Sequence, residues 1–316
     1  MLSAQKNSGF IQLIPLLIIV LLASFLIIGK SGFFPKTKEA TPSPSPTQEA
    51  SPSSTPTPIP TVASKASSTP SPTKSPTPSP NVVSSGPAGT GFSRITIATE
   101  RGNFTINLIS IDMGGSKMIT DTANDSDCAN DSTLPLSEYI SRNGGYAGMH
   151  GTYFCPADYA ECAAKKNSFD FPVYNSRLGK WINGGNLFWN NRSIVYYDGG
   201  GMHFMRNANS FGGGLSAGIV NDPGLLDGGA VIADQFPLSD KQRAKGTKGG
   251  IGIRGNVVYL VVAGSVDMLD LAHIFKSLGA SYALNLDGGG SVALWYGGYK
   301  VGPGRNLPNA IIFANK

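Results

Sequence analysis

The chain has 316 residues and a formal net charge of +5. The positive excess lies at the N-terminus, because residues 1–90 carry 6 lysines and arginines against 2 acidic residues, whereas the remainder carries 19 against 18. A nearly neutral remainder excludes a nucleic-acid-binding domain, which concentrates basic residues, and it is long enough to bury one full core.

The N-terminal segment, residues 1–34, contains an apolar run over residues 11–28 with only Gln12 and Ser24 as polar members. At about 1.5 Å per residue, a helix of this length just spans a hydrocarbon core about 30 Å thick. A cleaved signal peptide is the alternative, but no Ala-x-Ala-like site follows the run. We therefore expect a single-pass membrane anchor over residues 11–28.

Residues 35–90 consist mostly of Pro, Ser, Thr and Ala, and 14 of the 22 prolines of the chain lie between 35 and 87. Such a composition cannot bury a core, so we expect an extended, disordered linker. The positive-inside rule, applied to the lysines that follow the span, would leave the rest of the chain in the cytoplasm. A stalk beside a single span favours the opposite side, and we expect an extracytoplasmic domain at the cell membrane.

The folded domain is expected over residues 91–316, and its first element is predicted to be a β-hairpin. Apolar residues alternate on both sides of Arg101, Gly102 and Asn103, which is typical of two strands joined by a turn. Short strands separated by pairs of glycines dominate the middle of the domain. The pattern predicts a sheet-dominated α+β domain.

One helix is predicted near the C-terminus, where apolar residues recur at helical spacing from Met268 to Phe275. Asp267 is a candidate N-cap, and Gly279 is a candidate stop. Apolar runs flank the helix on both sides, so the segment is predicted to be a strand–helix–strand crossover. Asp287 then falls at the carboxyl end of the second strand, where open α/β sheets bind ligands.

The chain has three cysteines. Cys155 and Cys162 enclose a short loop, and such a pair suits a disulfide in a protein outside the cell. Two unpaired thiols are the alternative. Cys128 has no counterpart in this scheme and is left over.

Five ordered segments resemble the phosphodiester glycosidase family. They are "NDPGLLDGGAVI", "KGGIGIRGNVVYLVVAG", the predicted helix, "LGASYALNLDGGGSVAL" and "GRNLPNAIIF". Upstream, "GMHGTYF" at 148–154 is similar to the family's Asn-Gly-x-Tyr-Phe segment. The resemblance is strongest over residues 215–312. It implies a hydrolase that cleaves glycosyl (sugar-1-) phosphodiester bonds in cell-envelope or exopolysaccharide components.

The resemblance places the chemistry in the run "LDGGGS". Cleavage at the anomeric carbon passes through an oxocarbenium-like state and needs a nearby carboxylate, for which Asp287 is the candidate base or nucleophile. Backbone N–H groups of Gly288, Gly289 and Gly290 can form an anion-binding nest for the phosphate. Ser291 is expected to be a hydrogen-bonding neighbour.

Basic residues are needed to neutralise the phosphate, and Lys248 and Arg305 are the candidates. Two positions depart from the family pattern, which usually has Asn in place of His150 and Arg in place of Lys248. A lysine cannot reproduce the bidentate fork of a guanidinium, so Arg243 is an alternative phosphate ligand. His150 is a second catalytic candidate, and an ordinary buried histidine is the alternative for it.

These departures leave open a second class of function, a non-catalytic surface carbohydrate-binding module of the same fold. In both cases the expected partners are a carbohydrate or glycosyl-phosphate ligand and, through residues 11–28, the membrane, with no nucleic acid.

No cofactor is predicted, and no metal in the site. A structural calcium is the alternative for the cluster of Asp121, Asp125, Asp127 and Asp131, but the segment lacks the glycine and the final glutamate of an EF-hand loop. The segment "GLSAG" fits the G-x-S-x-G pattern of serine hydrolases, but the residues after it cannot form the required helix.

Overall fold

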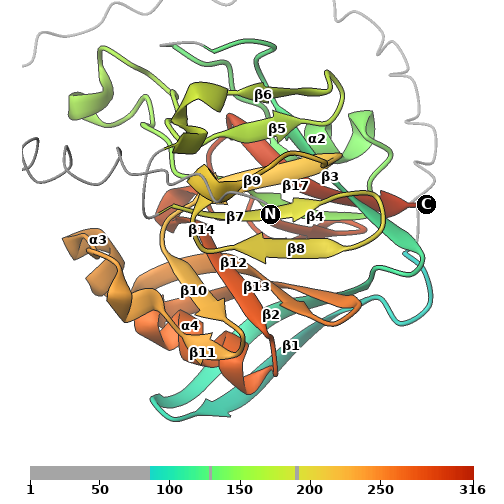
Figure 1. The fold of residues 1–316 in the computed structure, drawn as a ribbon. Coiled ribbons are helices and arrows are strands. Elements are labelled where there is room, and N and C mark those ends of the chain that lie inside the picture. The colour runs from blue at the N-terminus through green and yellow to red at the C-terminus, as the bar shows by residue number, and fades with distance from the viewer. Residues whose placement is uncertain (1–85, 128–129, 189–191) are drawn as a thin grey trace, which may run out of the picture. The chain divides into compact units, whose positions relative to one another are not determined.

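The computed structural model describes residues 86–127, 130–188 and 192–316 (Figure 1). The anchor expected over residues 11–28, the linker up to residue 85 and Cys128 lie outside the described residues. Within the described residues, no helix is both long and apolar enough to cross a bilayer. The strands that are described form three sheets in which all neighbouring strands are antiparallel, as expected for a sheet-dominated α+β domain.

The first sheet has seven strands. In order across the sheet they are β1 (Gly91–Thr99), β2 (Gly102–Asp112), β13 (Val257–Val266), β12 (Gly246–Arg254), β14 (Tyr282–Gly288), β10 (Gly224–Asp227) and β11 (Ala230–Val231). β1 and β2 form the predicted hairpin, with continuous pairing from Gly91 with Ser110 to Thr99 with Gly102.

The predicted helix is α4 (Met268–Ser277), and its ends are confirmed. The Asp267 carboxylate accepts a hydrogen bond from the Asp270 backbone N–H at 2.8 Å, and the Asp270 side chain accepts from the Asp267 N–H at 3.0 Å. Gly279 follows the last turn with φ +75°, a left-handed conformation that ends helices. The apolar face of α4 packs on one face of the first sheet (Figure 1).

The predicted strand–helix–strand unit is present, with one further strand inside it. β13 leads through α4 into β14, while β12 lies between these two strands and is antiparallel to both. β13 and β14 are therefore parallel to each other, which is why a helical crossover connects them. Asp287 is the penultimate residue of β14, so its predicted position at the carboxyl end of a strand is confirmed.

Two five-stranded sheets complete the domain. The second sheet has the order β16 (Tyr299–Val301), β15 (Leu294–Tyr296), β4 (Ala147–His150), β17 (Asn309–Asn315) and β3 (Ser116–Thr122). The third has the order β6 (Lys180–Ile182), β5 (Val173–Asn175), β9 (Ala217–Asn221), β7 (Ser193–Tyr197) and β8 (Met202–Met205).

The remaining helical segments of the described residues are short. They are α2 (Leu136–Arg142), α3 (Asp240–Arg243), η2 (Ala160–Cys162), η3 (Gly184–Phe188), η4 (Ala208–Ser210), η5 (Ala233–Gln235) and η6 (Gly289–Ser291).

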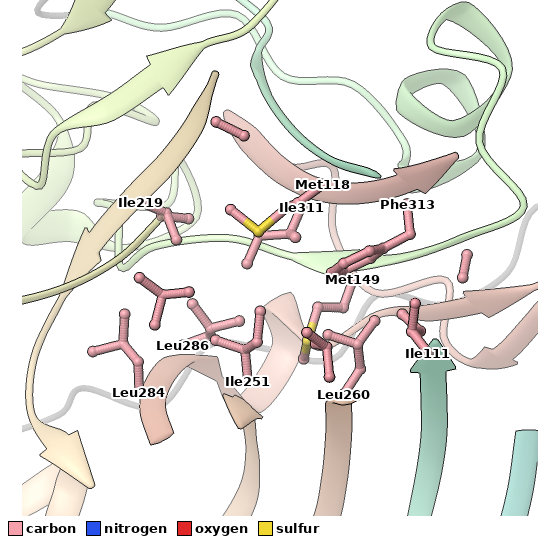
Figure 2. Packing of buried hydrophobic residues seen from close by; sticks show 14 of the residues in the cluster. Ile111, Met118, Met149, Ile219, Ile251, Leu260, Leu284, Leu286, Ile311 and Phe313 are labelled. Carbon is pink, nitrogen blue, oxygen red and sulfur yellow. The ribbon is translucent and has the colours of Figure 1, made fainter. Parts of the chain in front are cut away.

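The three sheets share one hydrophobic core. Leu284 and Ile251 contribute from the first sheet, Met149 and Phe313 from the second, and Ile219 from the third, and all five side chains are fully buried (Figure 2). Burial of this apolar surface is the main driving force for folding. Because β14 is part of this core, the end of the strand and the turn after it are held in a fixed place.

β17 is buried on both faces. Ile311 and Phe313 point into the shared core, whereas Ala310 and Ile312 pack in the cluster that includes residues of α2. Successive side chains of a strand point to opposite faces. Cover on both faces therefore explains why the run "NAIIFA" is continuously apolar rather than alternating.

Candidate active site

A cavity of about 560 Å³ opens beside the end of β14. Its walls come from the loop after β4, the residue after β9, the segment from α3 to the start of β12, and the turn from β14 into η6. An excess of basic side chains on such walls suits an anionic ligand. Among the described residues that line this cavity, the charged side chains are Arg192, Lys241, Lys245, Lys248 and Arg305 against Asp222 and Asp287.

Asp287 is the carboxylate that β14 delivers to this cavity. Its backbone N–H donates to the Gly151 carbonyl at 3.0 Å, and its side chain accepts from the Gly288 N–H at 2.7 Å and from the Ser291 hydroxyl. Burial outweighs these donors and raises the pKa of Asp287 to about 6, because removal from water disfavours the charged form. A carboxyl group that titrates near neutral pH is typical of a catalytic base or nucleophile.

Two kinds of constraint favour the three glycines after this carboxylate, a close approach by neighbouring atoms and a left-handed backbone. A Cβ at Gly288 would lie 3.0 Å from the Thr247 carbonyl oxygen, and a Cβ at Gly290 would lie 3.1 Å from the Arg305 guanidinium. Gly289 has nothing within 4 Å of a Cβ, but its backbone has φ +58°. Glycine adopts that left-handed conformation without the cost that a side chain adds.

The structure brings two of these glycines to the cavity, Gly288 and Gly289, whereas Gly290 is not among the lining residues. The Gly288 N–H is already taken by the Asp287 carboxylate. The Gly290 carbonyl accepts from the Arg305 backbone N–H at 2.9 Å. The anion-binding nest therefore stays a prediction. Of the three glycines, Gly289 is the one that both lines the cavity and has a backbone N–H not taken by Asp287.

Arg305 and Ser291 lie next to Asp287, as the sequence predicts. Arg305 Nη1 donates to Ser291 Oγ at 3.2 Å, and the Ser291 hydroxyl donates to the Asp287 carboxylate. Arg305 Nη2 pairs with Asp158 at 2.9 Å. Ser291 is therefore a donor that favours the ionised form of Asp287, and it connects this carboxylate to a cation.

Lys248 reaches the cavity, whereas Arg243 does not. Lys248 is half-buried, its Nζ donates to the Lys241 carbonyl at 2.7 Å, and burial lowers its pKa. Arg243 donates to the Leu238 carbonyl and lines a separate depression beside α4. Residues two apart on a helix point in nearly opposite directions, so α3 directs Lys241 to the cavity and Arg243 away from it. Sequence reasoning missed Lys241.

His150 is fully buried beneath the turn and is not among the lining residues. Its Nε2 lies 2.8 Å from the Asp287 carbonyl oxygen, and its Nδ1 lies 3.2 Å from the Ala293 N–H. These partners fit a neutral ring protonated on Nε2, and burial lowers the pKa of His150 to about 4. The imidazole packs against Gly249, where a Cβ would lie 2.5 Å from the ring. His150 therefore joins the two ends of the glycine turn and does not face a ligand.

Tyr153 lines the cavity and is a residue that sequence reasoning missed, although it stands in the quoted segment "GMHGTYF". Its Oη accepts from Asn285 Nδ2 at 2.7 Å and from Gln242 Nε2 at 3.3 Å. Both amide nitrogens also donate to the Asp222 carbonyl, which fixes them as donors. Because a phenol oxygen that accepts two hydrogen bonds still carries its own proton, the Tyr153 O–H is available to a ligand. Burial raises the pKa of this phenol, so it stays protonated.

Asp222 is a second carboxylate in the cavity, and sequence reasoning missed it as well. It follows β9 in the quoted segment "NDPG", where the only signal was its place in the resemblance. Gln242 and Arg192 favour its ionised form, but burial prevails and raises its pKa. A pair of carboxyl groups in one cavity is typical of enzymes that cleave glycosidic bonds.

The predicted disulfide between Cys155 and Cys162 is confirmed. The loop that it closes contributes Pro156 and Tyr159 to the wall of the cavity. The bridge thus belongs to the candidate site, which the spacing of the cysteines alone did not indicate.

The aspartate cluster proposed as a calcium site is engaged by protein donors. Arg142 pairs with Asp121 at 2.7 Å, and Arg177 pairs with Asp125. Within the described part of the chain, no three His, Cys, Asp or Glu side chains are grouped so as to hold a metal ion. The segment "GLSAG" runs directly into strand β9 rather than into a helix, which excludes the nucleophile elbow of a serine hydrolase.

Comparison with known proteins relates this arrangement to one family. The family model for phosphodiester glycosidase matches residues 164–314. The catalytic domain of zebrafish N-acetylglucosamine-1-phosphodiester alpha-N-acetylglucosaminidase, solved in a form auto-inhibited by its pro-peptide, is 12% identical with a TM-score of 0.55, over 74% of this chain and 87% of that chain. A hypothetical protein from Synechocystis is 14% identical with a TM-score of 0.50, over 72% of this chain and 62% of that one. No curated protein matches this chain.

The resemblance to the phosphodiester glycosidase family is confirmed, because the model of that family matches residues 164–314. Asp222, Lys248, Asp287 and Arg305 lie within the matched range, whereas Tyr153 and the whole disulfide-closed loop precede it. The solved structures show the same fold at low sequence identity. The chain spans less than two thirds of the Synechocystis protein.

Proposed function

We propose that this protein is a hydrolase that cleaves glycosyl phosphodiester bonds in cell-envelope or exopolysaccharide components. The observation that carries the proposal is Asp287, whose pKa is raised to about 6 in a cavity with an excess of cations. The matched family supports the same bond class. Anchoring through residues 11–28, with the domain outside the cell membrane, is part of the proposal and is supported by the apolar run and the proline-rich stalk.

In the proposed mechanism the substrate phosphate lies among the ammonium and guanidinium groups of Lys241, Lys248 and Arg305. These cations stabilise the negative charge that gathers on the phosphate as the bond breaks. A phosphate is a far better leaving group than an alkoxide, so the departing oxygen needs little protonation. The Tyr153 O–H donates a hydrogen bond to a substrate oxygen in the same cavity.

Asp287 acts at the anomeric carbon. As a nucleophile its carboxylate bonds to that carbon, the carbon–oxygen bond to phosphate breaks with its electron pair on the phosphate, and water then releases the sugar. As a base it takes a proton from a water that attacks in one step. Retention of the anomeric configuration in the released sugar marks the first route, and inversion marks the second.

The test is the release of free sugar from a library of sugar-1-phosphodiesters by the full-length protein in detergent. We expect at least one member to be hydrolysed by the wild type and the same member to be left intact by Asp287→Asn. An absence of both binding and release across sugars and anomers would contradict the proposal.

The second candidate function is a non-catalytic surface carbohydrate-binding module. The observation that favours it is the chemistry at two positions where the family usually has Asn and Arg. His150 is buried away from the cavity, and the Lys248 ammonium is partly used by a backbone carbonyl. Binding of a library member without release of sugar would favour this function.

A further inference from the structure

The loop that the disulfide closes, residues 155–162 and hereafter the disulfide loop, is fastened at its base. Besides the Cys155–Cys162 bridge, the Cys155 N–H donates to the Ser168 carbonyl at 2.8 Å, and the Cys155 carbonyl accepts from the Asn167 N–H at 2.6 Å. A short loop closed by a covalent crosslink has few conformations available to it. The residues at its tip are therefore presented to the cavity in a restricted position.

The tip of the disulfide loop contacts two cations of the cavity. Lys241 Nζ lies 4.7 Å from the centre of the Tyr159 ring, and the Arg305 guanidinium carbon lies 5.3 Å from it. Both distances are within the range of cation–π attraction. The neighbouring Asp158 pairs with Arg305 at 2.9 Å. Tyr159 is 36% exposed, so part of its ring stays accessible to solvent.

These contacts bring together two cations that are distant in sequence. Lys241 comes from α3, and Arg305 comes from the loop before β17. Arg305 also reaches Asp287 through Ser291. One aromatic ring on the disulfide loop therefore holds both cations beside the reactive carboxylate.

Long basic side chains lose conformational freedom when they bind an anion, and this loss weakens binding unless they are ordered beforehand. We propose that the disulfide loop orders Lys241 and Arg305 into a phosphate-binding pair, so that binding of the substrate phosphate depends on the Cys155–Cys162 crosslink. This inference rests on the proposed function. It assigns to the disulfide loop the role of positioning the two cations that bind the phosphate. Tyr159 and the bridge are positioning elements, because they act on the ligand through the two cations.

The test measures the dissociation constants of inorganic phosphate and of glucose 1-phosphate for the full-length protein in detergent, by calorimetry. Two variants break the arrangement in different ways: Cys155→Ser/Cys162→Ser removes the crosslink, and Tyr159→Leu keeps the crosslink but removes the ring. We expect about a tenfold increase in both dissociation constants for each variant, as the loss of order in two long side chains implies. Asp125→Asn is the matched control, because it breaks an exposed ion pair that does not line the cavity.

If the variant Cys155→Ser/Cys162→Ser folds poorly without its crosslink, Tyr159→Leu still tests the inference, because it changes a partly exposed side chain and leaves the bridge intact. Unchanged binding of both phosphate compounds by folded Tyr159→Leu would overturn the inference while leaving the proposed function in place. A wild type that binds neither compound, whatever the variants do, would contradict the phosphate site of the proposed function and this inference with it.

Discussion

Asp287, the proposed reactive residue, lowers the stability of the folded protein. An aspartate in an unfolded chain titrates near pH 3.9, whereas burial raises the pKa of Asp287 to about 6 in the folded protein. Between these two values the folded state binds more protons than the unfolded state, so the free energy of unfolding falls as the pH rises from about 4 to about 6. At neutral pH the protein therefore keeps an ionised carboxylate at the expense of folding stability.

The first prediction follows from this conflict between an ionised Asp287 carboxylate and the stability of the fold. Asp287→Asn should lower kcat by about 100-fold or more, since the charge of a base or nucleophile is lost. At pH 7.5 it should also raise the free energy of unfolding by roughly 1–3 kcal/mol, because folding of the variant no longer requires an ionised carboxyl group to be buried. Denaturant titrations at pH 4 and pH 7.5, together with steady-state kinetics, measure both effects. Turnover close to that of the wild type in the folded variant would show that the reactive group lies elsewhere.

The second prediction is a pH profile. We expect kcat/KM to fall below about pH 6, by about tenfold for each further unit, as Asp287 becomes protonated. His150 is neutral over this range, because burial lowers its pKa to about 4. His150→Gln should therefore change the rate without moving the midpoint of this acid limb. A midpoint that moves with this substitution would assign the limb to the histidine.

The third prediction concerns Tyr153. Tyr153→Phe removes the O–H that is free to reach a ligand, and kcat/KM should fall about tenfold, as expected for one hydrogen bond to a charged or developing anionic oxygen. Tyr139→Phe is the matched control, since the Tyr139 hydroxyl donates to the Leu307 carbonyl at 2.9 Å and does not line the cavity. Equal kinetic effects of the two substitutions would mean that Tyr153 acts only through stability.

At the scale of elements, β12 is a strand whose glycines make room for neighbours. A Cβ at Gly252 would lie 2.5 Å from the Phe275 ring of α4. The helix can therefore approach the sheet closely at this strand. This contact fixes α4, and with it the crossover that leads into β14.

The fourth prediction tests this contact. Gly252→Ala should lower the free energy of unfolding by about 1–3 kcal/mol, the usual cost of overpacking, and leave kcat unchanged. Gly264→Ala on the neighbouring β13 is the control, because a Cβ there has nothing within 4 Å. Thermal unfolding of both variants measures the difference. Similar stabilities for the two would mean that α4 shifts without cost.

The elements that the sequence predicted well are those with local signals. The helix has its cap, its spacing and its glycine within 13 residues, and both the hairpin and the position of Asp287 follow from short patterns. The cavity is different, since Tyr153, Asp222 and Asp287 are far apart in the chain and meet only through the order of strands in the sheets. No local pattern encodes that order. The sequence likewise did not indicate on which side of α3 Arg243 lies, because no helix was predicted over these residues.

At the scale of the whole molecule, the fifth prediction concerns its place in the cell. If residues 11–28 are an uncleaved anchor and the stalk lies outside, protease treatment of intact cells should release a fragment that begins within residues 35–90. An extended, proline-rich stalk is open to cleavage, whereas a packed domain resists it. N-terminal sequencing of the released fragment checks this. Protection of the domain until the cells are lysed would place it inside.

The contact between His150 and Gly249 links two positions that lie 99 residues apart in the sequence. With the imidazole in place, any side chain at 249 collides with it. A shorter asparagine at 150 would remove this collision and leave Met149 Cε as the near neighbour, 3.3 Å from a Cβ at 249. Substitutions at the two positions are therefore coupled: a larger residue at 249 is compatible with a smaller residue at 150 but not with this histidine. A histidine that does not line the cavity thus limits which residues can stand at position 249, beneath the turn that follows Asp287.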